Sequence, residues 1–239
     1  MFGAIDTLLR GGFSKREDLE RGRFDIPAST LIKAGILLGV SYGIFMGLFA
    51  ALRGGPGSMA QLGTSMVKVP SLFLLTLLVT FPSLYVFSAL SGSRLEFKDT
   101  LRLLLAAIAV NLTLLASFGP VTGFFTMSTE SYPFMILLNV FFFAVSGAIG
   151  LGFLKRALAT VFEVVPSAAG TSATPGQGAV NPASRVFQIW TLIYAVVGAQ
   201  MGWVLRPFVG SPNEPFQFFR ERQSNFFAAV LDALSNLMS

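Results

Sequence analysis

Long apolar runs separated by polar stretches dominate the chain from residue 31 to residue 205. A helix needs about 20 apolar residues to cross the hydrocarbon core of a bilayer. Five runs reach that length, none with a charged residue in its central part: about 31–52, 70–90, 101–125, 133–154 and 186–205. The pattern predicts an all-α polytopic membrane bundle of five transmembrane helices, the third of them broken near its end at Gly119-Pro120.

Amphipathic segments flank the predicted spans. The arm of residues 1–30 places four apolar side chains on one helical face, which predicts a short helix at the cytoplasmic membrane surface or packed beneath the bundle. From Phe227 to Met238 apolar side chains recur at helical spacing, and Ser224 or Asn225 is a suitable N-cap. We therefore expect residues 206–239 to form an external aromatic segment and an amphipathic helix on the outer membrane face.

The loops set the expected orientation of the five-span domain, residues 31–205. With a cytoplasmic N-terminus, 12 of the 17 Lys and Arg residues lie on the cytoplasmic side. Residues 166–184 are small, polar and rich in Pro and Gly, which predicts a flexible cytoplasmic linker. We expect an integral plasma (inner) membrane protein with its C-terminus outside and anionic lipids at its cytoplasmic face.

Composition restricts the available chemistry. The chain is 53% hydrophobic and 12% charged, carries a net charge of +5, and contains neither Cys nor His. Disulfides, thiol nucleophiles, Cys/His metal sites and histidine acid–base catalysis are thereby excluded. The acidic residues are scattered, so we expect no cofactor, no metal, no nucleic-acid partner and no enzymatic activity. An enzyme that modifies lipids would need a nucleophile or an acid–base pair near the membrane surface. Ser128, Glu130 and Ser131 lie on one predicted outer loop, but the sequence offers no group that would activate them.

Small residues mark candidate helix-packing faces. The first span has a glycine ladder at every fourth position: Gly35, Gly39, Gly43 and Gly47. Helices in lipid associate through close backbone contact, which small residues permit. The fourth and fifth spans repeat the spacing, at Ala144, Ala148 and Gly152 and at Gly198 and Gly202. These residues predict packing within the chain, with a homo-oligomeric contact as the alternative.

A few polar or aromatic residues in the spans are candidates for function. Asn111, Thr113 and Ser117 lie in the third span, and Asn111 near its centre needs a partner on another helix or in a polar path. Trp190, Trp203 and Arg206 in and after the fifth span are typical interface anchors. No charge lies at mid-depth of a predicted span, which argues against proton coupling through buried carboxylates.

The arrangement of these spans, with an inside N-terminus and an outside C-terminus, resembles the Yip1-like membrane proteins. The resemblance covers about residues 30 to 205 in topology only, and the family's early-span motif is not visible, so no residue roles follow from it. It implies a role in membrane organisation through partner binding; some bacterial membrane families of unknown role look similar. We expect a non-catalytic scaffold or assembly subunit of a larger membrane complex, bound to other membrane subunits or to a second copy. The alternative is an oligomeric channel or the membrane subunit of a transporter.

Overall fold

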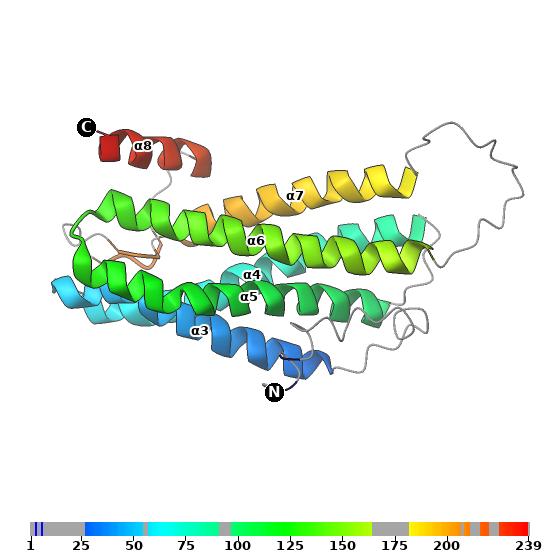
Figure 1. The fold of residues 1–239 in the computed structure, drawn as a ribbon, viewed down its shortest axis with the longest axis horizontal. Helices are drawn as coiled ribbons and strands as arrows, with labels where there is room; N and C mark the ends of the chain where they lie inside the picture. The colour runs from blue at the N-terminus through cyan, green and yellow to red at the C-terminus, as the bar shows by residue number, and fades with distance from the viewer. Residues whose placement is uncertain are drawn as a thin grey trace, which may run out of the picture.

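The apolar stretches fold as helices, which satisfy every backbone N–H and C=O within the segment. The computed structural model describes residues 3, 6, 27–54, 57–90, 97–163, 182–206, 208–210, 216–219 and 225–238. Within these ranges the chain is all-α and contains no strand. Six long helices follow one another: α3 (Ala28–Arg53), α4 (Ser58–Leu90), α5 (Phe97–Ser128), α6 (Tyr132–Glu163), α7 (Pro182–Leu205) and α8 (Phe226–Met238) (Figure 1).

The helices form an elongated bundle with a common long axis (Figure 1). Helices α3, α5 and α7 run in one direction along this axis, and α4 and α6 return in the other. Helix α3 packs against both α4 and α5, α6 packs against α5, and α7 lies on α4. Helix α8 lies beside α6, in the half of the bundle where α3 ends.

Four of the helices are long and apolar enough to cross a membrane: Ala28–Arg53, Ser58–Val86, Phe97–Ser128 and Tyr132–Ala157. The fifth predicted span is also helical, but its apolar part, Ile189–Leu205, is a shorter helix. The prediction of a helical membrane bundle is therefore confirmed for four candidate spans, and a fifth is not confirmed.

Glycines let α3 approach α4 until the two backbones touch. A Cβ atom added at Gly43 would lie 2.6 Å from the carbonyl oxygen of Ser65, and one at Gly47 would lie 2.8 Å from Cα of Leu62. At Gly39 the added atom would be 3.0 Å from Pro70. Real Cβ atoms do not come closer than 3.0 Å to such neighbours, so Gly43 and Gly47 require glycine for the observed packing. At Gly39 a side chain would fit only if Pro70 moved slightly.

The other side of α3 packs against α5 by a different arrangement. The ring of Phe45 occupies a hollow on α5, where a Cβ at Gly119 or Gly123 would lie 2.5 Å or 2.9 Å from it. Helix α5 continues without interruption through Gly119 and Pro120 to Ser128. The predicted break is thus not an unwound turn, and a kink at Gly119-Pro120 stays a prediction. Gly119 is used for helix packing, and Pro120 lies within the helix.

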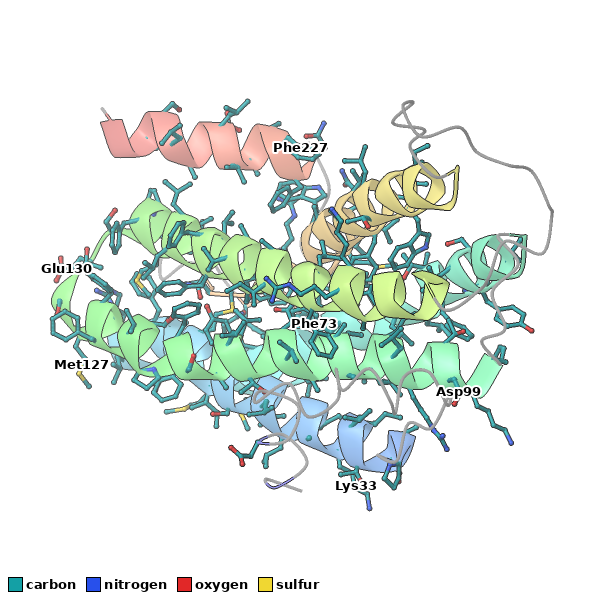
Figure 2. The ribbon with its side chains drawn as sticks, turned by 45° about the vertical axis from the view of Figure 1, so that its right-hand side comes forward. Lys33, Phe73, Asp99, Met127, Glu130 and Phe227 are labelled. Carbon is teal, nitrogen blue, oxygen red and sulfur yellow. The ribbon has the colours of Figure 1, made fainter. Side chains whose placement is uncertain are left out.

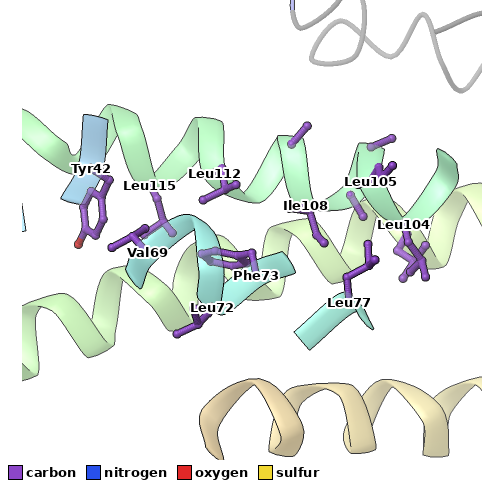
Figure 3. Packing of buried hydrophobic residues seen from close by; sticks show 14 of the residues in the cluster. Tyr42, Val69, Leu72, Phe73, Leu77, Leu104, Leu105, Ile108, Leu112 and Leu115 are labelled. Atoms are coloured by element: carbon purple, nitrogen blue, oxygen red, sulfur yellow. The ribbon is translucent and has the colours of Figure 1, made fainter. Parts of the chain in front are cut away.

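The core lies where α3, α4 and α5 meet. Tyr42, Phe73 and Ile108 belong to one cluster of buried apolar side chains contributed by these helices (Figure 3). The outward faces are apolar as well, with Leu78, Phe141 and others exposed. Helices that are apolar on both their buried and exposed sides suggest insertion into a membrane.

The C-terminal helix begins as expected, because Oδ1 of Asn225 accepts a 2.9 Å hydrogen bond from the backbone N–H of Ala228. Helix α8 runs alongside α6 (Figure 1). Its position on the outer membrane face stays a prediction. The predicted arm 1–30 and linker 166–184 lie outside the described residues, apart from positions 3, 6 and 27–30 and the start of α7.

Candidate functional site: the polar face of helix α4

Three polar side chains share one face of the first part of α4. Gln61, Ser65 and Lys68 are spaced four and three residues apart, so they lie above one another on the helix. All three are buried, and Lys68 is only 1% exposed. The apolar pattern predicted that the second span starts at about Pro70, which left Lys68 in an outer loop. That boundary is wrong, because α4 begins at Ser58.

The packing against α3 fixes the depth of Lys68. Gly43 faces Ser65 and Met66, whereas Gly39 faces Pro70, so Lys68 lies level with residues near the midpoint of α3. Lys68 also belongs to the candidate span Ser58–Val86. The candidate span on α4 therefore contains a charged residue that the predicted range 70–90 left out. An ionisable group inside a span is costly, and such groups commonly mark functional sites.

A non-helical part of the chain supplies oxygen atoms to this polar face. We call its described residues, 208–210 and 216–219, the C-terminal segment. The carbonyl oxygen of Phe208 accepts a 3.0 Å hydrogen bond from Nε2 of Gln61 and a second contact from Oγ of Ser65. The carbonyl oxygen of Phe218 accepts a hydrogen bond from Nζ of Lys68. Helix α4 thus provides the donors and the C-terminal segment provides backbone acceptors.

Aromatic rings complete the surroundings of the lysine. Nζ of Lys68 lies 4.8 Å from the ring centre of Phe218 and 5.1 Å from that of Phe219, within the range of cation–π attraction. In a helix the Cα–Cβ bonds tilt toward the N-terminus, so Lys68 extends toward the end of the bundle where α4 starts. Phe216 lies against Gly57 at that same end. Residues 216–219 therefore extend from the end of the bundle, at Gly57, to the ammonium group of Lys68.

Helix α7 positions the segment. Cβ atoms added at Gly198 and Gly202 would meet Thr76 and Leu72 of α4 at 3.7 and 3.5 Å. The indole N–H of Trp190 donates a 3.1 Å hydrogen bond to Oγ of Ser83. Since α7 and α4 are antiparallel, this register places the end of α7, at Leu205, level with Val69. The helix thus stops beside Lys68, and non-helical backbone continues along α4.

Gly210 fixes the course of this backbone. Its φ of 74° is in the left-handed region, which glycine adopts readily. A Cβ there would lie 2.5 Å from Gln61 and 3.1 Å from Ala50, so the backbone passes directly over the start of the polar face. Non-helical backbone at membrane depth is tolerated where protein buries it or where it lines a cavity. Here the donors of α4 satisfy two of its carbonyl groups.

The predicted packing residues fall into two groups. In the glycine ladder Gly39, Gly43 and Gly47 face α4, and Gly35 faces Leu112 of α5. Gly198 and Gly202 also face α4, so the structure places the fifth predicted span on the same helix but away from the ladder. Ala144 and Ala148 are exposed on α6, and a Cβ at Gly152 would meet nothing within 4 Å. The ladder's partner is therefore α4, which the sequence analysis had not proposed.

The three residues of the predicted polar path do not come together. Asn111 is 7% exposed and faces α6, where a Cβ at Gly150 would lie 3.1 Å from its own Cβ. Its Oδ1 is buried without a hydrogen-bond partner. The hydroxyls of Thr113 and Ser117 donate 2.7 Å hydrogen bonds to carbonyls of their own helix. At 100° per residue they lie about 160° and 120° around α5 from Asn111, on other faces of the helix.

The predicted interface anchors make contacts inside the chain. Trp190 is fully buried and Trp203 nearly so. The guanidinium of Arg206 lies 3.6 Å from the ring centre of Trp203. The buried indole of Trp190 cannot contact lipid head groups, and its N–H donates a hydrogen bond to Ser83. This tryptophan holds α7 against α4.

A second buried polar contact was also missed from sequence. The hydroxyl of Tyr42 on α3 donates a 2.7 Å hydrogen bond to Oδ1 of Asn139 on α6, and the amide of Asn139 donates to the carbonyl of Met135. Nothing in the sequence pairs Tyr42 with Asn139. The Lys68 face did carry a signal, because its polar spacing continues at helical intervals through Thr76, Thr80 and Ser83.

Comparisons with protein-family models, with curated proteins and with solved structures gave no match to this chain. Among the described residues, no three acidic side chains lie together in a group that could hold a metal ion.

Proposed function

We propose that the chain is a non-catalytic integral membrane scaffold, an assembly subunit of a larger membrane complex. The observation that carries the proposal is the use of interior polar groups as connections between elements. Tyr42 joins α3 to α6, Trp190 joins α7 to α4, and Lys68 joins α4 to the C-terminal segment. A bundle whose polar groups are engaged in its own packing is suited to presenting a fixed surface.

The surface that such a scaffold would offer is the outward face of α6. Ala144 and Ala148 are exposed there at four-residue spacing, beside the exposed Phe141 and Ile149. A transmembrane helix of another subunit can approach small side chains closely. The partner in this proposal is a membrane subunit, and a second copy of the chain is an alternative outcome of the experiment below.

Native-mass analysis and pull-down from the source membrane test the scaffold. We expect the tagged chain to migrate above its own 25.6 kDa with a membrane protein bound, and Ala148→Phe to release that protein. Leu192→Phe is the matched control, because Leu192 is exposed on α7, away from the small residues. Migration of the unmodified chain alone at its own mass in every mild detergent would contradict the proposal.

The orientation in this proposal follows from charge. Lys33, Lys98 and Lys155 are exposed at the ends of helices that meet at one end of the bundle, whereas Glu130 is exposed at the other. Figure 2 shows Lys33 and Asp99 at the first end and Met127 and Glu130 at the opposite one. The basic end is the cytoplasmic one by the positive-inside rule, next to anionic lipids of the inner membrane.

Thiol labelling tests this orientation, since the natural chain has no Cys. Three single variants, Lys33→Cys, Glu130→Cys and Asn236→Cys, are treated with a membrane-impermeant maleimide on intact cells. We expect labelling of the second and third, and of the first only after permeabilisation. Labelling of Lys33→Cys and Asn236→Cys from the same side would show that α7 and the C-terminal segment do not complete a crossing.

A channel or transporter subunit is the second candidate, and Lys68 is the observation that favours it. A cation near mid-depth, beside a helix that ends there and continues as non-helical backbone, is a combination that transporters use for binding sites. Flux of ions and small solutes into reconstituted liposomes tests this function. We expect Lys68→Met to abolish a genuine flux and Lys33→Met to leave it unchanged; no flux for any solute removes the candidate.

A further inference from the structure

Asn111 carries a buried oxygen atom that the chain itself leaves without a hydrogen bond. The residue is only 7% exposed, and no described residue donates to its Oδ1. It lies near the middle of α5, which is one of the four candidate spans. The acyl chains of a bilayer have no hydrogen-bond donor, so lipid around the bundle cannot satisfy this oxygen. Oδ1 of Asn111 is therefore an open acceptor near the middle of a span.

Two glycines of α6 lie along the carboxamide group of Asn111. A Cβ atom added at Gly150 would lie 3.1 Å from Cβ of Asn111 and 3.6 Å from its Cγ. For a Cβ atom added at Gly147, the only described atom within 4 Å is Nδ2 of the same asparagine, at 4.0 Å. Gly150 is thus in close contact with the asparagine, whereas Gly147 leaves room beside the end of its amide group. We call this space the Gly147 opening.

A row of small residues leads from this opening to the surface of α6. Gly150, Gly147 and Ala144 are spaced three residues apart, so each lies about 60° around the helix from the one before. Their exposure increases along the row, because Gly150 is buried, Gly147 is half-buried and Ala144 is exposed. Ala148, also exposed, lies next to Ala144 on the same outward face. A helix that packs on Ala144 and Ala148 therefore passes the Gly147 opening.

From these contacts we infer that a transmembrane helix of the partner subunit donates a hydrogen bond to Asn111 through the Gly147 opening. The partner helix packs on the small residues of α6 and carries a hydroxyl or carboxamide side chain, Ser, Thr, Asn or Gln, near the middle of its span. Such side chains form hydrogen bonds between helices in membranes. This assignment rests on the proposed scaffold function, because it names the chemistry of the subunit that docks on α6.

Removing the amide should have opposite effects on the free chain and on the complex. In the free chain the oxygen is buried without a donor, so Asn111→Leu should leave the protein folded and at least as stable. In the complex the same change removes the acceptor of the partner's donor. Binding should then weaken by about three- to fifteen-fold, the range found for hydrogen bonds between transmembrane helices. A residue that served only the folding of its own chain would not separate the two measurements.

Quantitative pull-down from the source membrane, with the full tagged chain, measures the retention of the partner. We expect weaker retention by Asn111→Leu and unchanged retention by Thr113→Val, because the hydroxyl of Thr113 lies on another face of α5 and bonds to its own backbone. Gly147→Val is a second test that keeps the amide and fills the opening. Its Cβ has room in the free chain, so we expect a folded protein with a similar loss of binding. If Gly147→Val is not monodisperse, Gly147→Ala replaces it.

A double-mutant cycle identifies the donor on the partner. Mass spectrometry identifies the captured protein, and each Ser, Thr, Asn or Gln in the middle of its spans is replaced by an apolar residue of similar size. One replacement should weaken binding to the unmodified chain by about the same factor as Asn111→Leu. In the Asn111→Leu background that replacement should cause no further loss. Additive losses at every position would overturn the hydrogen bond.

The outcomes separate this assignment from the scaffold function. A partner that Ala148→Phe releases but that Asn111→Leu and Gly147→Val retain in full would support the scaffold and overturn the hydrogen bond. The buried oxygen would then be satisfied within the chain, for example by an ordered water molecule. Capture of a second copy of the chain alone would overturn the choice of a different subunit as the partner. Migration of the unmodified chain alone in every mild detergent would contradict both proposals.

Discussion

Single atoms decide how the helices of this chain can pack. Gly43 lacks the one carbon atom that would collide with the carbonyl of Ser65, while Gly152 has open space in the corresponding position. Sequence spacing gave these two glycines the same interpretation, as parts of packing faces. The structure separates them, because one faces a neighbouring backbone and the other does not.

Gly43→Ala should therefore destabilise the protein, and Gly152→Ala should not. We expect a loss of about 1–3 kcal/mol in the free energy of unfolding for the first, as for other overpacked positions. Steric trapping in bicelles measures both variants in the same lipid. A Gly43→Ala variant as stable as the unmodified chain would show that α3 and α4 are not in backbone contact.

Asn111 gives a second prediction for a single side chain. Its Oδ1 is buried against α6 without a partner, which is unfavourable by about 1–3 kcal/mol for a polar atom. Asn111→Leu removes that oxygen, keeps the same branched shape, and should raise stability by about 1 kcal/mol. Thr113→Val on the same helix, at a hydroxyl bonded to its own backbone, should have almost no effect. A clear loss of stability in Asn111→Leu would show that the amide is needed.

At the scale of elements, each face of α3 makes a different kind of contact. Toward α4 it offers glycines that bring the backbones together, and toward α5 it inserts the ring of Phe45 between Gly119 and Gly123. The first contact depends on absent side chains and the second on a large side chain in a hollow. Helix α3 is consequently held on two sides. Its contacts with α4 fix the register of the two helices, and so the position of Lys68 relative to α3.

The Phe45 contact predicts a strong coupling between two positions. Gly119→Ala alone should destabilise the bundle, because the new methyl group meets the ring at 2.5 Å. In a Phe45→Ala background the same change should cost nothing, giving an interaction energy of about 0.5–3 kcal/mol. A double-mutant cycle of unfolding free energies measures it. Additive effects would mean that the ring does not occupy this hollow.

The sequence was sufficient for most elements but not for the site. Apolar length predicted helices α3 to α7 well, since helix formation in an apolar environment depends on local composition. It failed at the start of α4, where Gln61 and Lys68 resemble a polar loop in any window average. Their burial depends on carbonyl groups about 150 residues away, and no local pattern records such a partner. The pairing of Tyr42 with Asn139 could not be predicted for the same reason, because the two residues are 97 positions apart in the sequence.

At the scale of the whole molecule, the C-terminal segment closes the bundle. The other three candidate spans do not contact the donors of the α4 polar face through any described hydrogen bond. The register of α7 against α4 places the C-terminal segment over this face. The carbonyl oxygens of Phe208 and Phe218 bind the side chains of Gln61, Ser65 and Lys68. Stability of the bundle should therefore depend on the segment more than on the helix that follows it.

Truncation tests this dependence. Ending the chain after Arg206 should expose Lys68 and Gln61 to lipid and lower the thermal midpoint or cause aggregation, as measured by light scattering during heating. Adding Lys68→Met and Gln61→Leu should restore much of the stability. Removing only residues 226–239 keeps the carbonyls of the segment and should have a smaller effect. Equal stability of the full chain and the chain ending at Arg206 would contradict this account.

The distance in sequence between Lys68 and Phe218, 150 residues, has a consequence for biosynthesis. At 5–20 residues per second a ribosome needs about 8 to 30 s to make that stretch. During this interval the lysine has been synthesised and its acceptor has not. The first part of α4 is therefore expected to remain at the water interface, or in the polar interior of an insertase, until the C-terminal segment has been made. Final insertion of this helix then becomes a late step that waits for residues about 150 positions further along the chain.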